Sequence, residues 1–276
     1  WGLIMKMYTN ESDGDKFPVN NANWGRYGAM SISAVYPEYL TDLEILVCPS
    51  DAAAGDANAL SNSVDVLKQH ADAGTQPPQP SWYAIPTGME FNDLLEWYIS
   101  FSYSYVYLSH VVTNDSEMAA IDQLTWYAPG YTTPEFGAPG SNIADMRGFF
   151  DEDIDMGSWQ DYPITAAYNQ FPAMYAQDPS LASHVPSPFI YTGTGGSDTL
   201  LRMKEGIERF LITDINNPAG SAQAQSTIPV MMDSLIAPNV ANYGYAWINA
   251  SAGFNHTPGG CNVLFMDGHV EYQKYK

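Results

Sequence analysis

The chain has 276 residues, of which 45% are hydrophobic and 13% aromatic. This is the composition of a globular protein with room for one large domain. Ten Lys and Arg residues stand against 31 Asp and Glu residues, which gives a formal net charge of −21. Such a surface excludes nucleic acid and anionic membranes as partners, because phosphate binding depends on basic side chains. It attracts hard cations such as Ca²⁺, although the charge is explained equally well as a means of solubility.

The first residues, WGLIMKMYTNE, predict the last turns of a helix whose beginning is missing. One helical face carries the apolar side chains of Trp1, Leu3, Ile4, Met7 and Tyr8. The first residue is not an initiator Met, so we expect a processed precursor or a trimmed chain from which any targeting segment has been removed. No apolar run reaches the length that a membrane span needs.

Turn signals and apolar patterns predict the next elements. A short helix is expected at 37–42, a buried strand at 45–48 and an amphipathic helix at 61–71. Residues 97–112 alternate and are rich in aromatic and β-branched side chains, which favours a long strand. A further short helix should begin at an N-cap residue at 115 or 116.

Residues 126–198 lose this regular patterning and are rich in Pro, Gly, Tyr and Asp. Long stretches of this kind are functional loops or are packed down by their own aromatic side chains. Strands dominate the chain as a whole, and the helices are few and early. The pattern predicts an α+β fold in which an N-terminal helix packs on an antiparallel sheet.

The last residues, FNHTPGGCNVLFMDGHVEYQKYK, predict a β-hairpin. Asp267-Gly268 lies between two β-rich runs and favours a two-residue type I′ turn. The register that this turn sets gathers an apolar side for the core, made of Val263, Phe265, Val270 and Tyr272. The other side of the hairpin should be more exposed to solvent. It carries His269, Glu271, Asn262 and Gln273, together with Met266 and Leu264.

His256 precedes the TPGG bend, which allows its ring to fold back onto the turn. We expect a structural hydrogen bond from this ring to the Asp267 carboxylate. The alternative is a metal site made of His256, Asp267 and His269, because two imidazoles and a carboxylate are an established ligand set.

The two cysteines, Cys48 and Cys261, lie far apart in the sequence and have no zinc-type CxxC spacing. A disulfide between them would close a very long loop and stabilise the fold by roughly 5 kcal/mol in the chain-entropy model. Two buried free thiols are the other interpretation.

HTPGGCNVLFMDGHVEY resembles the C-terminal signature of a bacterial prepilin-like family, named for a His, nine residues and then Asp-Gly. The matching residues here are His256, Asp267 and Gly268, with ten residues in place of nine between His and Asp. Three other segments also resemble that family: WGLIMKMYTNESDGDKFP, YPEYLTDLEILVCPSD and KEGIERFLITDINNP…AQSTIPVMMD. The resemblance covers 1–50 and 199–276 and leaves 51–198 as an insertion that elaborates the sheet.

Members of that family are similar to type II secretion pseudopilins. The resemblance implies one pseudopilin-like domain over 1–276, which is an extracellular or cell-surface head left after removal of a prepilin leader. It also implies a noncatalytic structural protein that assembles into a filament or envelope complex through its N-terminal helix. The expected partners are copies of itself or other pseudopilin-like subunits.

An acidic loop, FFDEDIDMGSWQD, places Asp151, Asp153 and Asp155 at alternate positions. An EF-hand would need Gly and Glu where the chain has Met156 and Tyr162, so that motif is excluded. A looser Ca²⁺ site remains one interpretation, favoured by the Ca²⁺ loops of pseudopilins. A solvated acidic loop is the other.

Nothing in the sequence matches the GxSxG, HExxH, phosphate-loop or dinucleotide motifs, so we expect no enzyme activity. The aromatic residues, among them 19 Tyr and seven Trp, suggest a rival function. Flat rings with a polar edge stack on sugars, so a secreted carbohydrate-binding module with a polysaccharide partner is the alternative. A hydrolase is a weaker one.

Overall fold

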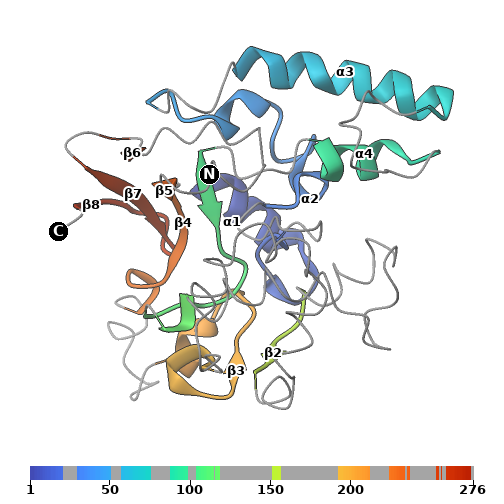
Figure 1. The fold of residues 1–276 in the computed structure, drawn as a ribbon. Coiled ribbons are helices and arrows are strands. Elements are labelled where there is room, and N and C mark those ends of the chain that lie inside the picture. The colour runs from blue at the N-terminus through green and yellow to red at the C-terminus, as the bar shows by residue number, and fades with distance from the viewer. Residues whose placement is uncertain are drawn as a thin grey trace, which may run out of the picture.

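The computed structural model describes residues 1–20, 30–50, 57–75, 88–98, 104–114, 116–118, 151–156, 192–211, 224–233, 235–236, 253–254, 256 and 259–274. The described part is of the α+β class, as the sequence predicts. Its helices come early in the chain, and an antiparallel sheet is completed by the last residues (Figure 1).

The described α-helices are α1 (Gly2–Glu11), α2 (Ile32–Val35), α3 (Ala57–Ala73) and α4 (Phe91–Tyr98). Helix α3 confirms the amphipathic helix expected at 61–71 and extends it at both ends. It packs on α4, which in turn packs on α2 (Figure 1). None of the helices in the described part of the chain combines the length and apolarity that crossing a membrane requires.

The expected helix at 37–42 and strand at 45–48 are wrong. Helix α2 lies earlier, and the apolar run forms a 3₁₀ turn, η2 (Leu43–Leu46). The Asp42 carboxylate caps η2 by accepting a hydrogen bond from the Glu44 backbone N–H at 2.9 Å. The turn buries Leu43 and Leu46. A short buried turn therefore has the same run of apolar residues as a short buried strand. Further 3₁₀ turns are η1 (Asp13–Asp15), η6 (Thr194–Gly196) and η7 (Ile207–Phe210).

The main sheet has four antiparallel strands in the order β1 (Tyr105–Tyr107), β4 (Pro229–Asp233), β7 (Gly260–Phe265) and β8 (Val270–Lys274). Two small antiparallel pairs accompany it: β2 (Ile154–Asp155) with β3 (Thr199–Leu200), and β5 (Leu235–Ile236) with β6 (Gly253–Phe254). The strand expected over 97–112 is therefore much shorter in the described part, because α4 takes its first residues. The N-cap expected at 115 or 116 is Asn114, whose Oδ1 accepts from the Ser116 and Glu117 N–H groups at 3.0 and 3.1 Å.

The hairpin β7–β8 confirms the element and corrects its register. Leu264 pairs with Val270 rather than with Glu271, because the turn contains three residues, 266–268. The Gly268 N–H donates to the Phe265 carbonyl at 2.9 Å, and Gly268 has a left-handed φ of 93°. This is the three-residue hairpin loop, a type I turn followed by a left-handed glycine.

The new register changes which side chains enter the core. Leu264 is buried and Met266 is only 1% exposed, whereas Val270 is 61% exposed and Tyr272 also lies at the surface. Of the apolar side predicted from a two-residue turn, Val263 is buried as expected, but Val270 and Tyr272 are not, so the prediction is wrong in part. Helix α1 covers the turn instead: a Cβ on Gly2 would lie 3.4 Å from Leu264 Cδ1 and 3.6 Å from the Gly268 Cα.

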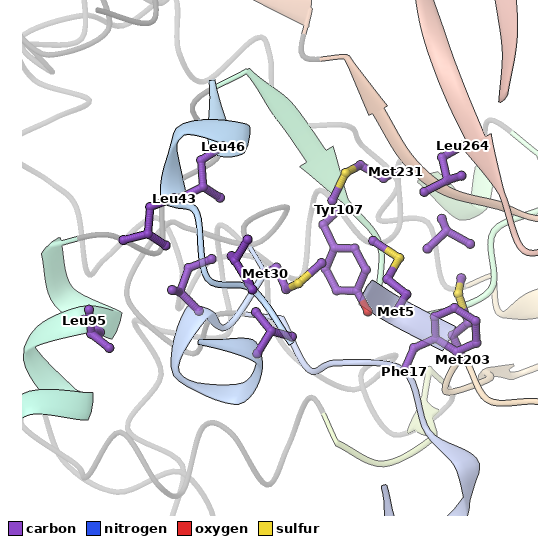
Figure 2. Close-up of a cluster of buried hydrophobic side chains, with 14 of the residues drawn as sticks. Met5, Phe17, Met30, Leu43, Leu46, Leu95, Tyr107, Met203, Met231 and Leu264 are labelled. Atoms are coloured by element: carbon purple, nitrogen blue, oxygen red, sulfur yellow. The ribbon is translucent and has the colours of Figure 1, made fainter. Parts of the chain in front are cut away.

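The core lies between α1, the sheet and the early helices. Helix α1 contributes Met5, which packs in one cluster with side chains from both ends of the chain (Figure 2). Those labelled in the figure include Phe17, Met30, Tyr107, Met203, Met231 and Leu264. The Thr9 hydroxyl, also buried, donates to the Met5 carbonyl at 2.6 Å, so this buried hydroxyl has a partner.

The register can be tested with two truncations in the hairpin. Met266→Ala should lower the free energy of unfolding by about 2–5 kcal/mol, because it leaves a cavity in the core. Val270→Ala should change it by less than about 0.5 kcal/mol, because Val270 faces solvent. Urea unfolding followed by circular dichroism measures both values. A large loss for Val270→Ala with a small one for Met266→Ala would restore the two-residue turn.

Candidate functional site

The structure does not bring His256 to Asp267, so the predicted hydrogen bond between them is wrong. Asp267 Oδ1 lies 2.5 Å from His269 Nδ1 and accepts from the His269 backbone N–H at 3.1 Å. Burial acts to raise the pKa of Asp267, but the hydrogen bonds from His269 outweigh it and hold that pKa below its ordinary value. The His269 ring also stacks on Phe265, with centroids 4.5 Å apart. The Asp-Gly dipeptide therefore works within its own turn.

His256 meets a different set of side chains. Its Nε2 lies 3.0 Å from Asp233 Oδ2, 3.0 Å from Asn262 Nδ2 and 3.6 Å from Cys48 Sγ. Asp233 ends β4, Asn262 is in β7 and Cys48 follows η2. The Asp233 side chain is 3% exposed and that of His256 is 26% exposed, so the cluster is buried on one side and accessible on the other.

Strand pairing and a glycine bend build this cluster. The pairing of β4 with β7 sets Asp233 beside Asn262, whose backbone N–H and side-chain amide donate to Asp233 Oδ2 at 2.7 and 3.0 Å. His256 forms an antiparallel bridge with Gly260. A Cβ on Gly260 would lie 2.4 Å from the Gln273 carbonyl oxygen, so only glycine fits where His256 folds over the start of β7.

The composition of the cluster suggests a Cys-His-Asp triad, but its geometry does not. In such triads the two ring nitrogens of the histidine face different partners, one the nucleophile and the other the carboxylate. Here Cys48 and Asp233 both approach the same atom, Nε2 of His256. The carboxylate therefore does not orient the ring for proton transfer from the thiol. Cys48, Asp233 and His256 instead offer three ligand atoms within 4.8 Å of one another, which could hold a metal ion.

The sequence pointed to two members of the cluster, His256 and Cys48, and missed Asp233. One feature of the sequence could have identified Asp233. It ends the apolar run IPVMMD, and a carboxylate in a buried strand is unfavourable unless it has a partner. Both Cys48 and Cys261 are free thiols in the structure, so of the two alternatives the free pair is observed. Burial, followed by the charge of Asp233, raises the pKa of the Cys261 thiol.

The acidic residues Asp151, Asp153 and Asp155 do not converge. Asp151 faces Lys16 Nζ at 3.2 Å and Arg202 Nη2 at 3.4 Å. Asp153 Oδ1 accepts from the Arg202 backbone N–H at 2.6 Å, and Asp155 lies in β2. Within the described ranges, these three carboxylates form no group of close ligand atoms. A Ca²⁺ site at this loop stays a prediction.

Arg202 and His110 anchor the same loop from inside the protein. The buried Arg202 guanidinium donates to the carbonyls of Ser109 and Phe17 at 2.8 and 2.5 Å. His110 is buried too, and its Nε2 lies 3.1 Å from the Glu152 carbonyl oxygen. Burial, and then the positive charge of Arg202, lowers the pKa of His110 to about 3. His110 therefore holds the loop as a neutral ring.

The apolar residues expected on one face of the first helix are divided between two. Ile4, Tyr8 and Trp1 are partly buried and pack against the core. Leu3 is 74% exposed and Met7 is 41% exposed. The inward direction is set by Met5 instead, so the predicted face is wrong in part. The two exposed side chains lie one helical turn apart on the outer side of α1.

Comparison of the chain with protein-family models, with curated proteins and with solved structures found no match.

The buried His110 predicts a loss of stability in acid. Its pKa is about 3 in the folded chain against an ordinary value of 6.5, so below pH 6.5 only the unfolded chain takes up this proton. The stabilisation is complete above that pH and is lost toward pH 3, by up to about 1.4 kcal/mol per pH unit. Urea unfolding at several pH values should show a shallower slope for His110→Asn.

The partly exposed His70 on α3 provides the control. His70→Asn makes the same substitution at a ring that is not buried, so it shows how much of any change in slope comes from the substitution itself. An unchanged slope in His110→Asn would contradict the account.

Proposed function

We propose that this chain is the head of a noncatalytic, pseudopilin-like structural protein that lies outside the cell or on its surface. It assembles into a filament or envelope complex through α1, with copies of itself or with similar subunits. The observation that carries this proposal is the two-sidedness of α1. Met5 and Thr9 fix the helix to the core, while Leu3 and Met7 face outward.

Leu3 and Met7 together form an apolar ridge suited to helix packing. Side chains four residues apart on a helix lie one above the other and fit the groove of a neighbouring helix. Full burial of a side chain of this size contributes about 1.5–3 kcal/mol. Burial of the ridge against a neighbouring subunit would therefore stabilise each contact in an assembly.

The net charge of −21 acts against association of identical heads. Salt screens such repulsion over a length of about 10 Å at 0.1 M. Association through α1 should therefore become stronger as the salt concentration rises. Contacts made through ion pairs would respond in the opposite direction.

The segments that resemble the prepilin-like family are also those that pack together. Helix α1 begins against the 266–268 turn, and the Phe17 N–H donates to the Met203 carbonyl at 3.1 Å. The Lys6 ammonium pairs with Glu205. The intervening segment contributes β1 to the sheet. Its helix α3 packs on η2 and on α4, and α4 packs on α2 (Figure 1). This supports a pilin-like core with an elaboration, in a single domain.

A double substitution on the outer side of α1 tests the proposal. The parent chain should associate in a concentration-dependent way, more strongly at higher salt. Leu3→Ser with Met7→Ser should weaken that association at least about tenfold, which is the loss of one buried apolar side chain. Sedimentation velocity over a concentration series measures the change, and the melting temperature should hardly move because both positions are exposed.

Val66→Ser provides the matched control, because Val66 is an exposed apolar residue on a different helix, α3. It should associate as the parent chain does. Association that survives the double substitution would contradict the proposal. A chain that stays monomeric throughout and is stabilised by a polysaccharide would favour the carbohydrate-binding alternative instead.

A further inference from the structure

The cluster around His256 has the chemistry of a metal site. Its three ligand atoms, Cys48 Sγ, Asp233 Oδ2 and His256 Nε2, all lie within 4.8 Å of one another. We propose that Cys48, Asp233 and His256 bind one divalent transition metal ion of the zinc type. This inference is separate from assembly through α1, since none of the three residues lies on that helix.

The distances suit a tetrahedral ion. Zinc binds thiolate, imidazole and carboxylate at about 2.0–2.3 Å, which sets neighbouring ligand atoms about 3.3–3.8 Å apart. His256 Nε2 is 3.6 Å from Cys48 Sγ and 3.0 Å from Asp233 Oδ2. The third pair, Cys48 Sγ and Asp233 Oδ2, lies within 4.8 Å, so side-chain rotations would bring the three ligand atoms to the distances that the ion needs.

Hydrogen bonds alone do not satisfy this arrangement. His256 Nε2 faces a donor, the Asn262 side-chain amide, and an acceptor, Asp233 Oδ2, each at 3.0 Å. A ring nitrogen that carries a proton suits only the carboxylate, and one with a free lone pair suits only the amide. Turning the amide over would bring its oxygen against Asp233 Oδ2, which already accepts from Asn262 Nδ2 at 3.0 Å.

A metal ion removes the conflict. The lone pair of His256 Nε2 and a carboxylate oxygen of Asp233 would both point at the cation, while Asn262 continues to donate to Asp233. Such a donor outside the ligand set orients the carboxylate. Asp233 is almost completely buried, and a buried carboxylate needs a compensating charge.

The ligand types define the class of ion. Thiolate and imidazole select zinc and its neighbours in the transition series, whereas Ca²⁺ and Mg²⁺ prefer oxygen ligands only. Binding would release the Cys48 thiol proton to solvent, and the thiolate and carboxylate together would neutralise a divalent cation. The partial exposure of His256 gives the ion a route of entry and leaves a fourth position for water.

The site would tie together three segments that are distant in the sequence. Cys48 lies just after η2, Asp233 ends β4, and His256 leads into β7. One ion at this point would hold the loop after η2 to the edge of the sheet. Metal binding should therefore raise the thermal stability of the head, because the site does not exist in the unfolded chain.

Cobalt titration of the tag-free folded chain tests the proposal. One Co²⁺ per chain should bind, with the strong visible absorption of a tetrahedral site and a thiolate charge-transfer band, and Zn²⁺ should displace it. Cys48→Ser should abolish the charge-transfer band, and His256→Gln should abolish stoichiometric binding. Asn262→Ala should weaken binding about 10- to 100-fold, as loss of a supporting hydrogen bond does.

A cysteine and a histidine outside the cluster serve as controls. Cys261→Ser and His269→Gln should bind Co²⁺ as the parent chain does, because neither side chain belongs to the cluster. Binding that persists in Cys48→Ser with its charge-transfer band intact, or that is lost in His269→Gln, would overturn the proposal.

A measurement on the unaltered chain covers the case in which a variant does not fold. Zn²⁺ should protect Cys48 from alkylation by iodoacetamide while Cys261 reacts at the same rate with and without the metal, as followed by peptide mass spectrometry. Equal alkylation of Cys48 in both conditions would overturn the proposal, as would a Cys48–Cys261 disulfide in the isolated protein. None of these outcomes bears on assembly through α1.

Discussion

The contact between the first helix and the last hairpin is the constraint on which the rest of the structure depends. Gly2 lies against Leu264 and Gly268, and Met5 packs in the same cluster as Leu264 and Met266. The contact joins the two ends of the chain around one core (Figure 2). Because α1 is fixed by its inward side, its outer side is left for a partner. Because the hairpin is fixed in register, β7 presents the cluster around His256 at the opposite end of the strand.

The fold was predictable where local patterns decide the structure. The apolar period of α3 and the Asp-Gly dipeptide between two β-rich runs both led to the right element. Asp-Gly, however, fits turns of two and of three residues equally well. The choice between them depends on whether Met266 or Val270 is buried in the core. The packing of α1, at the other end of the chain, determines which of the two is buried.

Tertiary contacts also overrule strand propensity in α4. The aromatic residues from Trp97 onward are typical of a strand, but Trp97 and Tyr98 are the last residues of α4. Leu94 and Leu95 are buried there, and Glu96 accepts a hydrogen bond from the Ser31 hydroxyl at 2.6 Å. The sequence around Glu96 does not predict this hydrogen bond, because Ser31 lies far away in the sequence.

Two residues of the candidate site were predictable from the sequence, but the carboxylate that meets them was not. His256 was identified as a histidine that needs a partner, and sequence proximity favoured Asp267. Strand pairing supplies Asp233 instead, because the end of β4 lies beside Asn262 in β7. The anchoring of the acidic loop by Arg202 and His110 was not predicted. Whether a charged side chain is buried or exposed depends on the tertiary structure and cannot be recognised from the residue type alone.

The central claim is that an acidic head assembles through the outer side of α1. Electron cryomicroscopy of the native material is its most direct test. The account predicts ordered filaments or envelope assemblies in which Leu3 and Met7 lie buried between neighbouring subunits. Native material that contains only separate heads, or assemblies in which α1 faces solvent, would contradict it.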